Sequence, residues 1–304
     1  MGSPFEPGRW PTLNAWAAAA WSLELVLYAS LAFPAVRKSL DRVDRRVLAL
    51  GLTLSSLLSY LTFAPAAGMF EARGALMLVA LSGALSLWPL ILPRSRLADA
   101  GFLVLLAGVT LAKPWKVIYA SPWEWPPMDP LGQLMWIRVG IVSALVLRKA
   151  EGIGFGWIPT RREWRIGTAW FLAFLPAGLT LGLALGLVGG IQLRQPLWRE
   201  LLLAVATFFG MLWVVALAEE FFFRGLLQRW ATAWLGSATR AWLLASALFG
   251  LAHLPFRGFP NWRFALLAAV AGLFYGRAYL AAGGIRAAMV AHALTNTVWR
   301  VLLE

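Results

Sequence analysis

Cysteine is absent from this 304-residue chain, and charged residues and histidines are scarce. Without cysteine the protein can form no disulfide, no thiolate nucleophile and no cysteine-based metal site. Only 13% of the residues are charged and 60% are hydrophobic, whereas an average soluble domain has about a quarter charged and a half apolar. This balance extends over the whole length and excludes a water-soluble enzyme and a disordered chain.

The apolar residues form long continuous runs, which are typical of membrane-spanning helices. We therefore predict an all-α fold, a polytopic transmembrane helical bundle. At roughly 20 residues per span, the length allows about eight to ten crossings. The expected spans are Pro11–Phe33, Val47–Ala66, Ala75–Leu92, Phe102–Ile118 (broken by Pro114), Leu134–Leu147, Thr168–Ile191, Leu201–Trp230, Ala241–Leu254, Phe264–Leu280 and Ile285–Leu302.

The loops predict a division of the chain and an orientation. A polar linker, Arg148–Gly167, separates residues 1–150 from residues 151–304. Twelve basic residues are assigned to loops after odd-numbered spans, from Arg37 to Arg165, and five to loops after even-numbered spans, from Arg73 to Arg199. By the positive-inside rule this places the N-terminus outside. The segment Met1–Arg9 lacks a basic region and a cleavage site, so we expect no removable signal peptide.

The net charge of +13 fits this topology better than a nucleic-acid partner, because the basic residues lie in short loops between apolar runs. We expect a multi-pass protein of a plasma membrane, in a prokaryote, whose surroundings are the lipid bilayer. No nucleic-acid partner is expected.

Some isolated residues within the expected spans have simple structural explanations. Glu24 lies in the first span, where a lone hydrogen-bonded carboxylate is commoner than a functional one. Arg138 lies near the end of a span, so its long side chain can reach the interface. Gly178, Gly182 and Gly186 form a stripe of small residues at helical spacing, which predicts a close approach to a neighbouring helix.

Two adjacent carboxylates, Glu219 and Glu220, need a different explanation. A charged side chain within a span costs about 2.5–3.5 kcal/mol on insertion scales, so the pair needs partners or access to water. Arg224 follows Glu220 by four residues, which places both on one helix face and allows an ion pair. The two carboxylates alone would also fit a helix that ends at the membrane surface.

The only two histidines, His253 and His292, also lie in apolar spans. His292 precedes Asn296 by four residues, so these two side chains share one helix face. A single histidine in a span is more often a hydrogen-bonded core residue than a ligand. Two histidines, an asparagine and a glutamate pair are a rarer set, and buried polar groups must meet each other or water. We therefore predict one polar chamber between the helices that gathers them.

Such a chamber could hydrolyse a substrate in two ways. In a zinc version, Glu220, His253 and His292 are the metal ligands, and Glu219 is the general base that acts on a water. In a metal-free version, Glu219 and His253 activate the water, while His292 and Asn296 hold the oxyanion. The zinc version is slightly favoured here, because a cation would help to neutralise two adjacent carboxylates.

Three motifs resemble those of the CPBP family, also called ABI, which groups CAAX-prenyl endopeptidases with bacteriocin-processing and bacteriocin-immunity proteins. The motifs are Glu219-Glu220-x-x-x-Arg224, Phe249-x-x-x-His253 and His292-x-x-x-Asn296. The resemblance covers about Arg165–Leu303, so residues 151–304 are the expected catalytic domain and residues 1–150 are variable transmembrane helices. It implies an intramembrane endopeptidase whose catalytic residues are Glu219, Glu220, Arg224, His253, His292 and Asn296. The metal dependence of this family is disputed.

The function we predict is hydrolysis of a peptide bond in a membrane-associated protein or peptide substrate, with a glutamate-activated water. One alternative is an immunity or accessory protein on the same scaffold, but a scaffold would not need the complete set of motifs. The other is a proton-coupled transporter, in which buried Glu and His form a relay. The sequence shows neither repeated halves nor discontinuous helices that would favour a transporter.

The predicted orientation can be measured by cysteine labelling, because the chain has no cysteine of its own. A single cysteine introduced within Arg37–Arg46 or Ala150–Arg162 should react with an impermeant reagent only from the cytoplasmic side, as the positive-inside rule requires. Labelling of both segments from outside would reverse the orientation.

Overall fold

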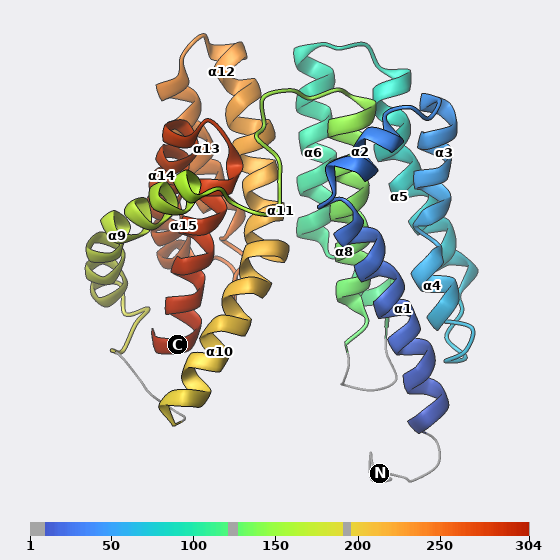
Figure 1. Cartoon of the computed structure of the whole chain (residues 1–304), viewed down its shortest axis with the longest axis horizontal. Helices are drawn as coiled ribbons and strands as arrows, with labels where there is room; N and C mark the ends of the chain where they lie inside the picture. The colour runs from blue at the N-terminus through green and yellow to red at the C-terminus, as the bar shows by residue number, and fades with distance from the viewer. Residues whose placement is uncertain (1–9, 121–126, 191–195, 304) are drawn as a thin grey trace. The chain divides into compact units, whose positions relative to one another are not determined.

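The computed structural model of the chain describes residues 10–120, 127–190 and 196–303. Over these residues the ordered elements are helices, with no strand among them, so the predicted all-α class is confirmed. The helices form two compact units, Met1–Ala150 and Glu151–Glu304 (Figure 1). Each unit is described by itself.

The first unit begins with two helices that are joined at a sharp bend. The chain turns by 86° between the first two helices, where Phe33 is extended and Pro34 starts the next helix. A second break lies between Ala112 and Trp115, at Pro114, where the sequence predicted it. The helices are α1 (Trp10–Ser30), α2 (Pro34–Leu40), α3 (Arg45–Ser55), α4 (Leu58–Phe63), α5 (Ala72–Ile91), α6 (Arg96–Ala112), α7 (Trp115–Ile118) and α8 (Asp129–Val142), which continues as a π-helical turn η1 (Ser143–Leu147).

The second unit is built around one continuous helix of 39 residues, Leu197–Leu235. At 1.5 Å per residue it is about 58 Å long, nearly twice the hydrocarbon thickness of a bilayer. Its parts are α10 (Leu197–Gly210), η2 (Met211–Ala216), α11 (Leu217–Glu220), η3 (Phe221–Gln228) and α12 (Arg229–Leu235). The other helices are α9 (Arg161–Ala184), α13 (Ala238–Ala252), α14 (Trp262–Ala282) and α15 (Ile285–Val298), which ends in η4 (Trp299–Leu303).

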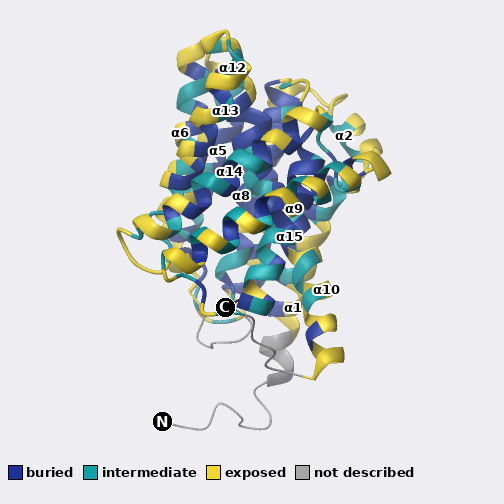
Figure 2. Cartoon of the chain, turned by 90° about the vertical axis from the view of Figure 1, so that its left-hand side faces the viewer, coloured by how far each residue is buried: buried dark blue, intermediate teal, exposed yellow. Residues whose placement is uncertain are grey.

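By length and composition, six described helices could cross a membrane, or seven if the bent pair at the start counts as one span. These six or seven candidates are fewer than the eight to ten crossings that the apolar runs predict. The run expected at Ala241–Leu254 forms a helix of only 15 residues, and α6 has 17, so both are shorter than the roughly 20 residues of a typical span. The ribbon of α10 is coloured partly as exposed in Figure 2. The exposed residues of this helix include Leu197, Leu202 and Val205, whose apolar side chains suit contact with lipid. The protein is thus a multi-pass membrane protein by its helices.

Close contacts hold the second unit together. A Cβ added to Gly250 of α13 would lie 2.6 Å from the Ala265 carbonyl oxygen of α14, so only glycine allows these helices to pack this closely. The start of α9 is fixed by a capping box, in which Thr160 and Glu163 bond to each other's backbone N–H. Glu163 also pairs at 2.8 Å with Arg286 in the first turn of α15, so the cap ties α9 to that helix.

A buried ion pair joins distant helices of the first unit. Arg138 of α8 donates from Nε to Glu24 Oε1 of α1 at 2.9 Å, and both residues are nearly inaccessible. Arg138 also donates from Nη1 to Ser55 Oγ at 2.8 Å, and Ser59 Oγ donates to Glu24 Oε2 at 3.3 Å. Arg138 therefore does not extend to the interface, as its sequence position had indicated. It neutralises the lone carboxylate of the first span.

Replacing Glu24 with Gln should lower the stability of the first unit strongly, because it leaves the Arg138 charge buried without a counter-ion. Breaking a buried pair in this way typically costs about 3–5 kcal/mol. Thermal unfolding in detergent measures the change. The matched control is Asp41→Asn, at the exposed pair with Lys149, which should leave the unfolding temperature unaltered. Equal effects of the two substitutions would contradict a structural role for the buried pair.

Candidate active site

The two adjacent carboxylates of the sequence motif lie at the end of α11, within the long helix of the second unit. π-helical turns flank this short segment on both sides, η2 before it and η3 after it. A π turn has hydrogen bonds from residue i to i+5, and such turns are frequent at functional sites. The directions of Glu219 and Glu220 therefore depend on local departures from the regular helix.

Glu220 is fully buried, and two groups hold its carboxylate. Its Oε1 accepts a hydrogen bond from Arg224 Nη1 at 3.1 Å, so the predicted ion pair is formed. The same oxygen lies 2.7 Å from His292 Nδ1. Because a carboxylate oxygen can only accept, His292 Nδ1 carries the proton of this bond. Glu220 therefore sets the tautomer of His292 and leaves the Nε2 of the neutral ring as an acceptor.

Arg224 connects this carboxylate to two further helices. Its Nη2 donates to the carbonyl oxygen of Gly272 on α14 at 2.9 Å. Its guanidinium carbon lies 4.7 Å from the centre of the Phe249 ring on α13, within the range of a cation–π contact. The charge of Arg224, which has no exposed surface, is thus balanced within the unit.

Aromatic rings fix the imidazole of His292. The ring of Tyr275 stacks on it at 4.6 Å with an angle of 14°, and Phe249 meets it edge-on at 5.7 Å. The sequence reasoning missed Tyr275. The signal that could have found it is a tyrosine within an apolar span, between Gly272 and Gly276.

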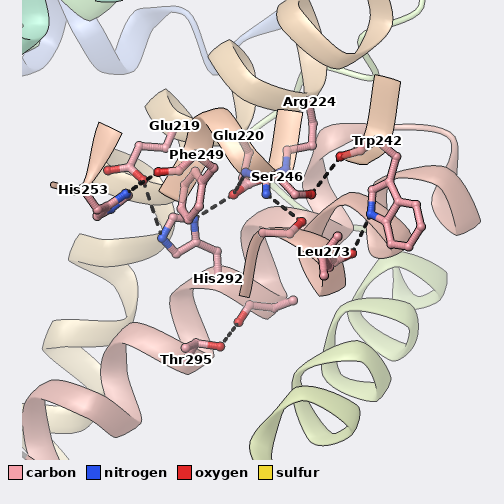
Figure 3. Close-up of polar contacts among 12 residues, drawn as sticks. Glu219, Glu220, Arg224, Trp242, Ser246, Phe249, His253, Leu273, His292 and Thr295 are labelled. Carbon is pink, nitrogen blue, oxygen red and sulfur yellow. Dashed lines mark hydrogen bonds and ion pairs between the residues drawn. The ribbon is translucent and has the colours of Figure 1, made fainter. Parts of the chain in front are cut away.

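His253 follows the last residue of α13, so the end of that helix determines its position. Its Nδ1 lies 2.7 Å from the carbonyl oxygen of Phe249, which can only accept, so Nδ1 is the protonated nitrogen. The other nitrogen, Nε2, faces Glu219 Oε2 at 4.0 Å. His292 Nε2 approaches the same oxygen at 3.9 Å (Figure 3). Two imidazoles and one carboxylate therefore converge.

The atoms that converge are all hydrogen-bond acceptors when both histidines are neutral. Glu219 Oε2 is buried and has no hydrogen-bond partner among the described residues. A group that supplied hydrogen atoms or positive charge would complement these atoms. A water molecule bonded to two partners at about 2.8 Å spans a separation close to 4 Å and supplies two hydrogens.

A cavity of about 240 Å³ adjoins these groups, much larger than the roughly 30 Å³ that one water molecule occupies. Glu219, His253, His292 and Asn296 all line it. The Nδ2 of Asn296 lies 3.7 Å from Met211 Sδ, a weak acceptor, so this amide can donate to a stronger acceptor within the cavity. The structure thus brings all the residues of the three motifs to one region, with Glu220 and Arg224 behind the cavity wall.

The predicted zinc ligands, Glu220, His253 and His292, are not arranged around a common point. Glu220 Oε1 and His292 Nδ1 face each other in a hydrogen bond, so these two atoms are not free to bind one ion. In the part of the chain that the structure describes, no group of three or more His, Asp or Glu side chains is placed to hold a metal. The reason for favouring zinc also weakens, since Arg224 and His292 already pair with Glu220. The metal content stays a prediction to be measured.

Comparisons with known proteins address the family. Residues 200–298 match the family model described as type II CAAX prenyl endopeptidase Rce1-like. Neither the curated proteins nor the solved structures contain a match to the chain. The matched segment runs from α10 to the end of α15 and includes all three motifs. This match implies a protease of the CAAX type acting on a protein substrate. Residues 200–298 are an Rce1-like domain of the CPBP family, as the three motifs indicated.

Proposed function

We propose that this protein is an intramembrane endopeptidase, which hydrolyses a peptide bond in a membrane-associated protein or peptide by means of a water activated by Glu219. The observation that carries the proposal is the convergence of His253 Nε2 and His292 Nε2 on Glu219 Oε2, at 4.0 and 3.9 Å, beside a cavity. Glu219 is partly exposed there, whereas Glu220 is buried and paired. Only the first carboxylate can therefore meet a substrate.

In this mechanism a water lies between Glu219 and the two imidazoles. It donates one hydrogen to Glu219 Oε2 and the other to an Nε2 atom, which leaves an oxygen lone pair for attack. As the water oxygen bonds to the carbonyl carbon of the substrate, Glu219 takes up the proton as general base. Glu220 does not touch the substrate; it positions His292 through the Nδ1 hydrogen bond.

The tetrahedral intermediate carries a negative oxygen, and Asn296 Nδ2 is the donor that can hold it. Loss of one such donor typically costs about 2.7–4 kcal/mol of transition-state stabilisation. When the intermediate collapses, the carbon–nitrogen bond breaks and the protonated Glu219 returns its proton to the leaving amine. The carboxylate is then regenerated, so one water is consumed for each peptide bond.

The substitution Glu219→Gln tests the proposed base, because Gln keeps the shape of the side chain and cannot take up a proton. We expect turnover to fall about 10²–10⁴-fold, as for the loss of a general base, while the unfolding temperature stays unchanged. Proteomics of membrane fractions from cells with the wild type or the variant identifies cleaved proteins, and a peptide from one of them serves for kinetics.

The matched control is Glu151→Gln, which makes the same chemical change at an exposed residue of the same unit, away from the cavity. This control should keep wild-type turnover. Activity of Glu219→Gln within a few-fold of wild type would rule out Glu219 as the base. Identical membrane proteomes would contradict the endopeptidase and favour an accessory protein on the same scaffold.

Elemental analysis separates the two versions of the mechanism. The metal-free version predicts active protein with less than about a tenth of an equivalent of any transition metal, and activity that survives chelation. His292→Ala should then abolish activity without any loss of metal. Stoichiometric zinc that disappears in this variant would contradict the metal-free version.

A further inference from the structure

One wall of the cavity comes from α9, which lies outside the segment that matches the Rce1-like family. The wall residues are Phe171, Phe174, Leu175, Gly178 and Leu179. They recur at intervals of three and four, so they occupy one face of the helix. No polar side chain belongs to this set. The α9 wall, as we call these five residues, is thus an apolar surface in the same cavity as the polar groups.

Two residues of the α9 wall determine its shape together. A Cβ added to Gly178 would lie 2.6 Å from Phe174 Cζ, because the Phe174 ring folds over that glycine. At Gly178 the stripe of small residues therefore makes room for a ring of its own helix, whereas at Gly182 an added Cβ would lie 3.7 Å from Trp299 of η4. Any side chain at residue 178 must move the Phe174 ring.

The Phe174 ring has little freedom to move elsewhere. It contacts the ring of Phe274 at 5.4 Å and that of Tyr275 at 6.4 Å, both on α14. Tyr275 in turn stacks on His292. The ring therefore connects the α9 wall to the residues proposed to act on the scissile bond, and displacing it changes the space beside that bond.

We propose that Phe174 and Gly178 determine which apolar side chain of a peptide substrate is accepted next to the scissile bond. This inference rests on the proposed endopeptidase function. A scissile carbonyl at Glu219 and Asn296 places its neighbouring residues within the same cavity, and the α9 wall offers them only apolar contacts. The catalytic groups come from the family domain, and the selection of the side chain comes from α9.

The test uses an unmodified peptide library derived from a proteome, incubated with the full-length protein in liposomes and read by mass spectrometry. Phe174→Ala enlarges the cavity, so the preferred residue should become larger. Gly178→Ala pushes the ring into the cavity, so the preferred residue should become smaller; alanine also favours the helix. Each methylene of misfit should change the ratio of kcat/KM between two peptides by at least about tenfold.

The matched control is Leu172→Ala, on the exposed face of α9, which should keep the wild-type preference. Unchanged preferences in both wall variants, with cleavage intact, would overturn the inference and leave the proposed function standing. Failure of wild-type protein to cut any peptide would instead count against the proposed function. If Phe174→Ala lowers the unfolding temperature, the single variant Phe174→Leu replaces it as the variant with the larger cavity. Its preference is then compared with that of the single variant Gly178→Ala.

Discussion

The carboxylate of Glu220 is the group on which the rest of the site depends. It is fully buried, and it accepts hydrogen bonds from Arg224 within its own helix and from His292 on α15. Arg224 extends the connection to the Gly272 carbonyl on α14. Removing a partner from a buried charge typically costs several kcal/mol, so the three helices are held in one arrangement. That arrangement orients the imidazole of His292 toward Glu219.

Adjacent residues of the same type thus have different environments. Successive side chains of a helix point about 100° apart, and Glu219 and Glu220 accordingly face different nitrogen atoms of His292. Glu219 is partly exposed to the cavity, and its Oε2 lacks a hydrogen-bond partner among the described residues. Glu220 can serve only to position another group, whereas Glu219 can react with what enters the cavity.

The first unit shows the contrasting case of a carboxylate that is fully engaged. Arg138 donates to one oxygen of Glu24 and Ser59 donates to the other, so both oxygens have partners and the charge is neutralised. Both units place an ion pair inside apolar helices, where a lone charge would be costly. What distinguishes the second unit is the additional acceptors that converge beside a cavity.

The helical class, the pairing of Glu220 with Arg224 and the gathering of the motif residues near one cavity could be predicted from the amino-acid sequence. These follow from hydropathy, from the four-residue spacing along a helix and from the need of buried polar groups for partners. The folded structure was needed to find that Glu220 pairs with His292, 72 residues away, and that Arg138 pairs with Glu24, 114 residues away. It also showed that the Phe174 ring lies over Gly178. Periodicity constrains side chains within one turn of a helix, whereas π turns and the packing of distant helices decide which faces meet.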